Sequence, residues 1–77
     1  MNELDARGLS CPEPVIMIKG AIDSAKVNGA VPAGSLFTIL VDNRTSVENI
    51  TRFGEHAGLD VTSTEKDGDF MITLKKA

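Results

Sequence analysis

A nearly uninterrupted apolar run, Leu36-Phe37-Thr38-Ile39-Leu40-Val41, constrains the fold of this chain more than any other feature of its sequence. A run of this kind is typical of a central strand in a sheet. Helix-like patterns stand on both sides of it. The chain has 77 residues, and single domains usually span roughly 50 to 200 residues. The sequence therefore predicts one domain with a small core.

The segment before this run predicts a short strand followed by a helix. Residues 2–6 form the extended segment, which ends at Arg7-Gly8. Ser10-Cys11-Pro12 predicts the start of the helix, because proline is favoured at the first helical position, where an N–H would have no partner. We expect the helix to end near Asn28-Gly29, since glycine commonly follows a helix C-terminus. The apolar stripe of this helix comprises Val15, Ile18, Ile22 and Ala25.

A second helix and a hairpin follow the apolar run. Thr45-Ser46-Val47-Glu48 fits a capping box with Thr45 as the N-cap. Gly58 should close this helix, and Asp67-Gly68 is a strong turn signal between two strands. The narrow apolar face of the helix comprises Val47, Ile50, Phe53, Gly54 and Ala57. In the last strand, Phe70, Ile72 and Leu74 alternate with Asp69, Met71, Thr73 and Lys75, so one face is expected to be buried.

The predicted element order is β-α-β-α-β-β, an α/β fold with two helices on one face of a four-stranded sheet. If the first two strands are parallel, the first helix is their crossover, and both strands end at the edge where both helices begin. Open α/β sheets tend to place ligands at that edge. Cys11 and residues 42–44 are therefore expected to be neighbours despite their separation in the sequence.

Composition narrows the classes of partner. The net charge is −3, and the eight basic residues are scattered along the chain, so the basic face that phosphate contacts require is missing and nucleic-acid binding is not expected. A single cysteine excludes an internal disulfide and an all-cysteine metal site, and it favours a reducing cytoplasm. Neither a signal peptide nor a membrane span is apparent, so we expect a cytoplasmic protein.

Cys11 is the strongest candidate for chemistry. A thiol reacts as thiolate, and its ordinary pKa of about 8.5 falls near a helix N-terminus or beside cations. Pro12 and Pro14 lack N–H groups, which leaves the first turn few donors. Arg7 and Arg44, both expected at this edge, offset that loss, so we predict moderate activation. The alternative is a lone cysteine that acts only as a small buried hydrophobe.

Other polar residues are weaker candidates. His56 is expected to be a solvated residue near the negative end of the second helix. The sequence lacks the paired histidines or second cysteine of a metal site. Residues 42–44 are turn and pre-cap residues by default. The acidic side chains Glu65, Asp67 and Asp69 are expected to form a solvated hairpin tip.

The segment Leu4-Asp5-Ala6-Arg7-Gly8-Leu9-Ser10-Cys11-Pro12-Glu13-Pro14 resembles the N-terminal signature of TusA/SirA-like proteins, whose hallmark is Cys-Pro-x-Pro. The resemblance covers essentially the whole chain and implies a single TusA/SirA-like domain over residues 1–77. It implies a two-layer α/β sandwich with a mixed sheet. Val41-Asp42-Asn43, with Glu48-Asn49 and Arg52-Phe53, is most similar to the TusA-like domain of YedF-type proteins, which are linked to selenium metabolism.

The resemblance also implies a role. Cys11 would accept a persulfide sulfur from a cysteine desulfurase or a rhodanese-like donor and relay it to an acceptor protein, without a cofactor. The chain is then a monomer that acts as a sulfur carrier or sulfurtransferase, with catalysis supplied mainly by its partners. The surface expected to bind these partners comprises Arg7, Pro12, Glu13, Pro14, Lys19, Asp42, Asn43 and Arg44.

Two alternatives stay open. The first is a non-enzymatic interaction or regulatory module in which Cys11 is structural or redox-sensing, since the sequence offers no second catalytic group. The second is a selenium-handling domain that uses the same thiol, which rests on family analogy alone.

Overall fold

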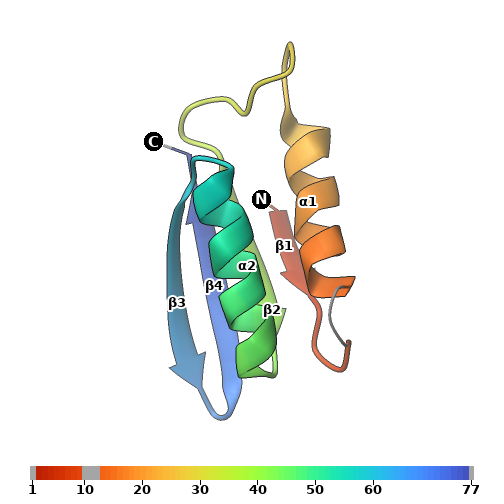
Figure 1. The fold of residues 1–77 in the computed structure, drawn as a ribbon, viewed down its shortest axis with the longest axis vertical. Helices are drawn as coiled ribbons and strands as arrows, with labels where there is room; N and C mark the ends of the chain where they lie inside the picture. The colour runs from red at the N-terminus through yellow and green to blue at the C-terminus, as the bar shows by residue number, and fades with distance from the viewer. Residues whose placement is uncertain (1, 10–12, 77) are drawn as a thin grey trace.

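The computed structural model describes residues 2–9 and 13–76, which form a two-layer α/β sandwich with both helices on one face of the sheet (Figure 1). The elements are β1 (Asn2–Asp5), α1 (Glu13–Ala25), β2 (Leu36–Val41), α2 (Arg44–His56), β3 (Asp60–Lys66) and β4 (Asp69–Lys75). The strand order in the sheet is β1-β2-β4-β3. β1 runs parallel to β2, whereas β4 is antiparallel to both of its neighbours. The predicted element order, mixed sheet and layer arrangement are confirmed.

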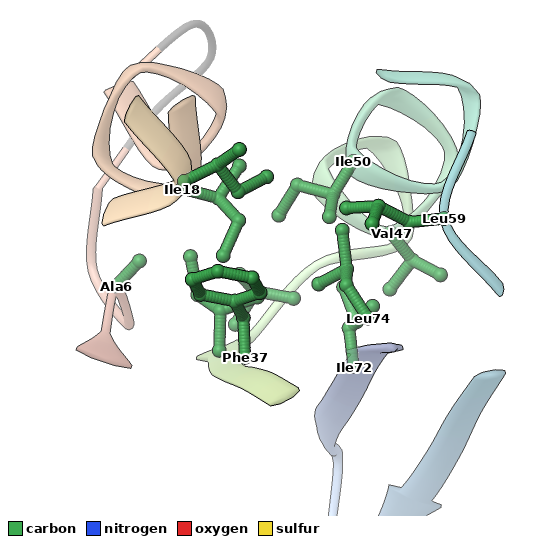
Figure 2. Close-up of a cluster of buried hydrophobic side chains, with 11 residues drawn as sticks. Ala6, Ile18, Phe37, Val47, Ile50, Leu59, Ile72 and Leu74 are labelled. Atoms are coloured by element: carbon green, nitrogen blue, oxygen red, sulfur yellow. The ribbon is translucent and has the colours of Figure 1, made fainter. Parts of the chain in front are cut away.

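The core lies between the helices and the two central strands, β2 and β4 (Figure 2). Side chains of a strand alternate between the two faces of the sheet, and in β2 Phe37, Ile39 and Val41 are buried. Their neighbours on β4 include Leu74 and Ile72, which pair with Phe37 and Ile39. Burying a side chain of this size contributes about 1.5–3 kcal/mol. The apolar run thus forms the centre of the domain.

Helix α1 packs on this core through Ile18 and Ile22, as its apolar stripe predicts. The expected start at residues 10–12 lies outside the described residues, and the described helix begins at Glu13. The predicted end near Asn28-Gly29 is wrong, because the helix stops at Ala25. Asn28 and Gly29 have φ values of 53° and 82°, so they form a two-residue turn of the kind that closes hairpins. Residues Val27 and Ala30 on either side of it exchange two backbone hydrogen bonds of 2.8 and 3.1 Å.

Helix α2 begins at Arg44, two residues earlier than the capping box predicts. The N-cap is Asn43, whose side-chain oxygen accepts a 2.8 Å hydrogen bond from the backbone N–H of Ser46. The prediction of Thr45 as the N-cap is therefore wrong. Gly58 follows the C-cap with φ of 81°, as expected, whereas Ala57 is exposed rather than part of the buried face.

The hairpin of β3 and β4 confirms the turn at Asp67-Gly68, whose φ values are 53° and 85°. Phe70, Ile72 and Leu74 face the helices, and Met71 lies on the opposite, open face of the sheet. Among the described residues, the helices are too short and too polar to cross a membrane.

Candidate functional site

The carboxyl ends of β1 and β2 lie at one edge of the sheet, because the two strands are parallel with Asp5 paired to Leu40. Both helices also begin at this edge (Figure 1). We call it the β1–β2 edge and define it by residues 5–9 and 40–44. This is the arrangement that the sequence predicts for the segment before Cys11 and for residues 42–44.

The loop after β1 is attached to β2 at two points. The backbone N–H of Ala6, a fully buried residue, donates a 2.8 Å hydrogen bond to the carbonyl oxygen of Leu40. The N–H of Gly8 then donates to the Oδ2 atom of Asp42, also at 2.8 Å. This bond lowers the pKa of the Asp42 carboxyl, with a smaller contribution from the side-chain amide of Asn43. The Asp42 carboxylate therefore holds together two segments that are far apart in the sequence.

Arg7 makes a second set of connections at this edge. Its Nη2 and Nε atoms lie 2.9 and 3.0 Å from the two carboxylate oxygens of Asp5, and its Nη1 atom lies 3.4 Å from Oδ2 of Asp69. The hydrogen bond to Arg7 lowers the pKa of Asp5 to about 2, and the bond to Asp5 raises the pKa of Arg7. Arg7 thereby links β1 to the start of β4.

The position of Asp69 corrects one prediction. We expected this residue at a solvated hairpin tip with Glu65 and Asp67, and those two are exposed. Asp69 instead pairs with Arg7, and 33% of its side chain is exposed. The reason is topological: β4 lies next to β2, so the beginning of β4 reaches the β1–β2 edge. A single sequence does not say which strand of the hairpin is the inner one, so the pattern could not reveal this contact.

Arg44 lies on the same edge in different surroundings. It is the first residue of α2, and its guanidinium carbon stands 5.4 Å from the ring centroid of Phe70. Contact of this kind with an aromatic face is attractive for a cation. Unlike Arg7, Arg44 is paired with no carboxylate of the described residues. Within the part of the chain that the structure describes, no ion pair therefore offsets its positive charge.

Cys11 and Pro12 lie outside the described residues, so their expected place at this edge stays a prediction. The residues on either side are described. Leu9 is half-buried, and its N–H donates to the carbonyl oxygen of Ala6 at 3.3 Å. At the start of α1, Glu13 is exposed and Pro14 is buried.

Two other candidates lie away from this edge. Lys19 is exposed on α1 and lines a hollow together with Phe53 and Lys76. It lies six positions after Glu13 in the helix, about 9 Å along the axis. His56 is exposed in the last turn of α2, as predicted. The structure thus brings Arg7, Asp42, Asn43 and Arg44 together and leaves Lys19 apart.

The sequence as a whole matches one family model, described as sulfurtransferase TusA, over residues 2–76. A putative sulfur carrier protein of Methanocaldococcus jannaschii is 32% identical over 77 residues, which cover 99% of this chain and 95% of the relative. The sulfur carrier protein TusA of Allochromatium vinosum is 30% identical, with 99% of this chain and 93% of the relative covered.

The fold has a close counterpart among solved structures. The crystal structure of a SirA-like protein from Desulfitobacterium hafniense superposes with a TM-score of 0.85 and 36% sequence identity. The match covers 96% of this chain and 95% of that chain. Sequence and fold therefore agree along nearly the whole length.

Proposed function

Because the chain belongs to the TusA sulfurtransferase family, we propose that it is a sulfur carrier that holds sulfur on Cys11 as a persulfide. One observation carries this proposal: the family match over residues 2–76 includes the only cysteine of the chain. Relatives that cover nearly the whole chain are named sulfur carrier proteins, which supports the same role.

The proposed transfer needs no cofactor. The thiolate of Cys11 attacks the outer sulfur of a donor persulfide, R–S–SH, as in thiol–disulfide exchange. A new S–S bond forms on Cys11 while the donor S–S bond breaks, and the donor leaves as the thiolate R–S⁻. The numbers of electrons and protons are unchanged, so neither an oxidant nor a reductant is consumed. Transfer to the acceptor is the same step with Cys11 as the donor.

The β1–β2 edge contributes to this chemistry through a hydrogen-bonded segment before Cys11 and through a cationic side chain. The bonds of Ala6 and Gly8 hold the segment that precedes Cys11 in the sequence against β2. Arg44 adds a cation without a carboxylate partner among the described residues, and a nearby cation favours the thiolate form of a cysteine.

We further propose that protein partners dock on this edge. The donor is a cysteine desulfurase or a rhodanese-like protein, and the acceptor is a second protein that takes the persulfide sulfur. Asp42 and Arg44 are exposed there, and Glu13 is exposed at the start of α1, which begins beside this edge. Charged rim residues of this kind mainly set the rate and specificity of protein association.

Mass spectrometry after incubation with a cysteine desulfurase and cysteine tests the carrier role. We expect one added sulfur atom on Cys11, a mass increase of about 32 Da, that a reducing agent removes. The Cys11→Ser variant is the matched control and should stay unmodified. Failure to form the adduct with several desulfurases, while iodoacetamide still alkylates Cys11, would contradict the proposal.

The same variant separates the carrier role from a purely regulatory one. In a sulfur carrier, Cys11→Ser keeps partner binding but abolishes sulfur delivery to the acceptor. If the variant retained both binding and full function in cells, the chain would be an interaction module in which the thiol is dispensable.

A further inference from the structure

A hollow of about 380 Å³ lies at the end of the molecule opposite the β1–β2 edge. Its walls are the second half of α1 with Lys26 after it, residues 29–31, the C-terminal end of α2 and the residue after β4. The larger apolar side chains of its lining are Ile22, which is buried, and Val31 and Phe53, which are half-buried. The volume falls at the lower end of the range of small-molecule sites, about 300–1,000 Å³.

Lysines surround this apolar lining. Lys19 comes from α1, Lys26 directly follows that helix, and Lys76 follows β4. Among the described residues, the only carboxylate in the lining is that of Asp23, whose Oδ1 atom lies 3.2 Å from Nζ of Lys26. Neither Lys19 nor Lys76 pairs with a carboxylate of the described part of the chain. The hollow therefore has an excess of positive charge, although the whole chain carries a net charge of −3.

Hydrogen bonds fix the backbone in two parts of the wall of the hollow, at Lys76 and at the turn after α1. The N–H of Lys76 donates to the carbonyl oxygen of Ser35 at 2.9 Å, and its own carbonyl oxygen accepts from Gly34 at 2.8 Å. The paired residues Val27 and Ala30 hold the adjacent turn. A preformed hollow with a few convergent polar groups is the usual form of a small-molecule site.

We propose that this hollow binds a small amphipathic anion. The apolar body of the ligand packs against Ile22, Val31 and Phe53, and its carboxylate or phosphate-ester group lies at the lysines. A small ligand fits better than a protein surface, because the basic groups converge from two walls on a concave site instead of spreading over a flat face. The site is separate from the β1–β2 edge, so the proposal does not depend on the sulfur-carrier role.

Two-dimensional NMR of the ¹⁵N-labelled protein tests this proposal, with sodium octanoate and phenyl phosphate as the ligands. We expect saturable shifts of the amide signals of Gly29, Ala30, Val31 and Ala57 with at least one of these anions. The anion that binds more tightly shows whether the site prefers a carboxylate or a phosphate ester. 1-Octanol has the same apolar body as octanoate without the charge, and it should bind more weakly.

A matched pair of variants tests the contribution of the lysines. Lys76→Gln removes one charge from the hollow and should weaken binding of the anion about fivefold, as expected for one partly exposed charge pair. Lys75→Gln changes the preceding residue, which lies in β4 outside the lining, and should alter the affinity less than about twofold.

Three results would overturn the proposal. The first is equal binding of 1-octanol and octanoate, and the second is equal weakening by the two lysine variants. The third is the lack of binding of either anion; if Lys76→Gln then also loses protein-partner binding, these lysines are assigned to protein docking. The persulfidation assay tests the sulfur-carrier role independently of this ligand site. Failure of one proposal therefore does not decide the other.

Discussion

Arg7 and Arg44 both lie at the β1–β2 edge, yet they have different electrostatic surroundings. The guanidinium of Arg7 is shared between Asp5 and Asp69, so its charge is largely cancelled at a distance. Arg44 contacts the ring of Phe70 and has no such carboxylate among the described residues. Proximity to the edge alone, which is all that a sequence can predict, does not distinguish them.

We therefore expect Arg44→Ala to slow alkylation of Cys11 by iodoacetamide more than Arg7→Ala does. Loss of an uncompensated cation disfavours the thiolate, and an exposed charge interaction of less than about 1 kcal/mol corresponds to a rate decrease of about two- to threefold near neutral pH. The measurement is the alkylation rate as a function of pH for both variants. An unchanged pH profile in Arg44→Ala would remove this arginine from the environment of the thiol.

At the scale of single elements, two helical glycines illustrate how much the packing around a position matters. A Cβ atom added to Gly54 of α2 would lie 2.5 Å from Cγ2 of Val61 and 2.8 Å from Cδ2 of Leu74. At Gly20 of α1, no atom lies within 4 Å of the added Cβ. Gly54 thus permits α2 to approach β3 and β4 closely.

The two substitutions to alanine are expected to have opposite effects. Gly20→Ala should stabilise the protein by about 0.5–1 kcal/mol, since alanine has less backbone freedom to lose in a helix. Gly54→Ala should destabilise it by about 1–2 kcal/mol, because overpacking exceeds the same helical gain. Urea unfolding of both variants measures the difference, and stabilisation by Gly54→Ala would mean that the sheet moves away at little cost.

The sequence predicts elements well where local chemistry is unambiguous. The bounds of β2 and the turn at Asp67-Gly68 agree with the structure, because a long apolar run and an Asp-Gly pair each have one favoured conformation. The start of α2 was predicted incorrectly, because Asn43 and Thr45 are both good N-cap residues. Only the observed hydrogen bond from Ser46 to Asn43 decides between them.

The candidate site was predictable only in part. Parallel pairing of β1 with β2 brings the loop after β1 and residues 42–44 to one edge, and the bond between Gly8 and Asp42 agrees with that inference. The ion pair of Arg7 with Asp69 depends on β4 being the inner strand of the hairpin. That choice follows from tertiary packing and not from a local pattern.

On the scale of the whole molecule, the ion pairs of Arg7 connect β1 to β4 across the end of β2. The pKa of Asp5 falls from 3.8 to about 2 in the folded protein. A group with a lowered folded pKa contributes stability above its unfolded pKa and loses it as the pH falls through its folded pKa. The contribution of Asp5 is therefore complete above about pH 4 and is lost towards about pH 2.

The Asp5→Asn variant should therefore show a smaller loss of stability between about pH 4 and about pH 2 than the unmodified chain does. The free energy of unfolding, measured with urea across this range, checks the expectation. Glu3→Gln is the control, since Glu3 lies on the same strand and has no ion pair among the described residues. Parallel pH profiles for Asp5→Asn and the unmodified chain would contradict the role of this pair.

The place of β1 in the sheet has a consequence for motion. β1 has four residues, lies at the edge of the sheet and pairs with β2 alone. Short edge strands open at a lower free energy than the centre of a domain. The amide protons of β1 should therefore exchange with solvent faster than those of β2 and β4. Local opening of β1, the strand that precedes Cys11 in the sequence, is thus expected at a lower free energy than opening of β2 or β4, so the chain before the cysteine can move while the core stays folded.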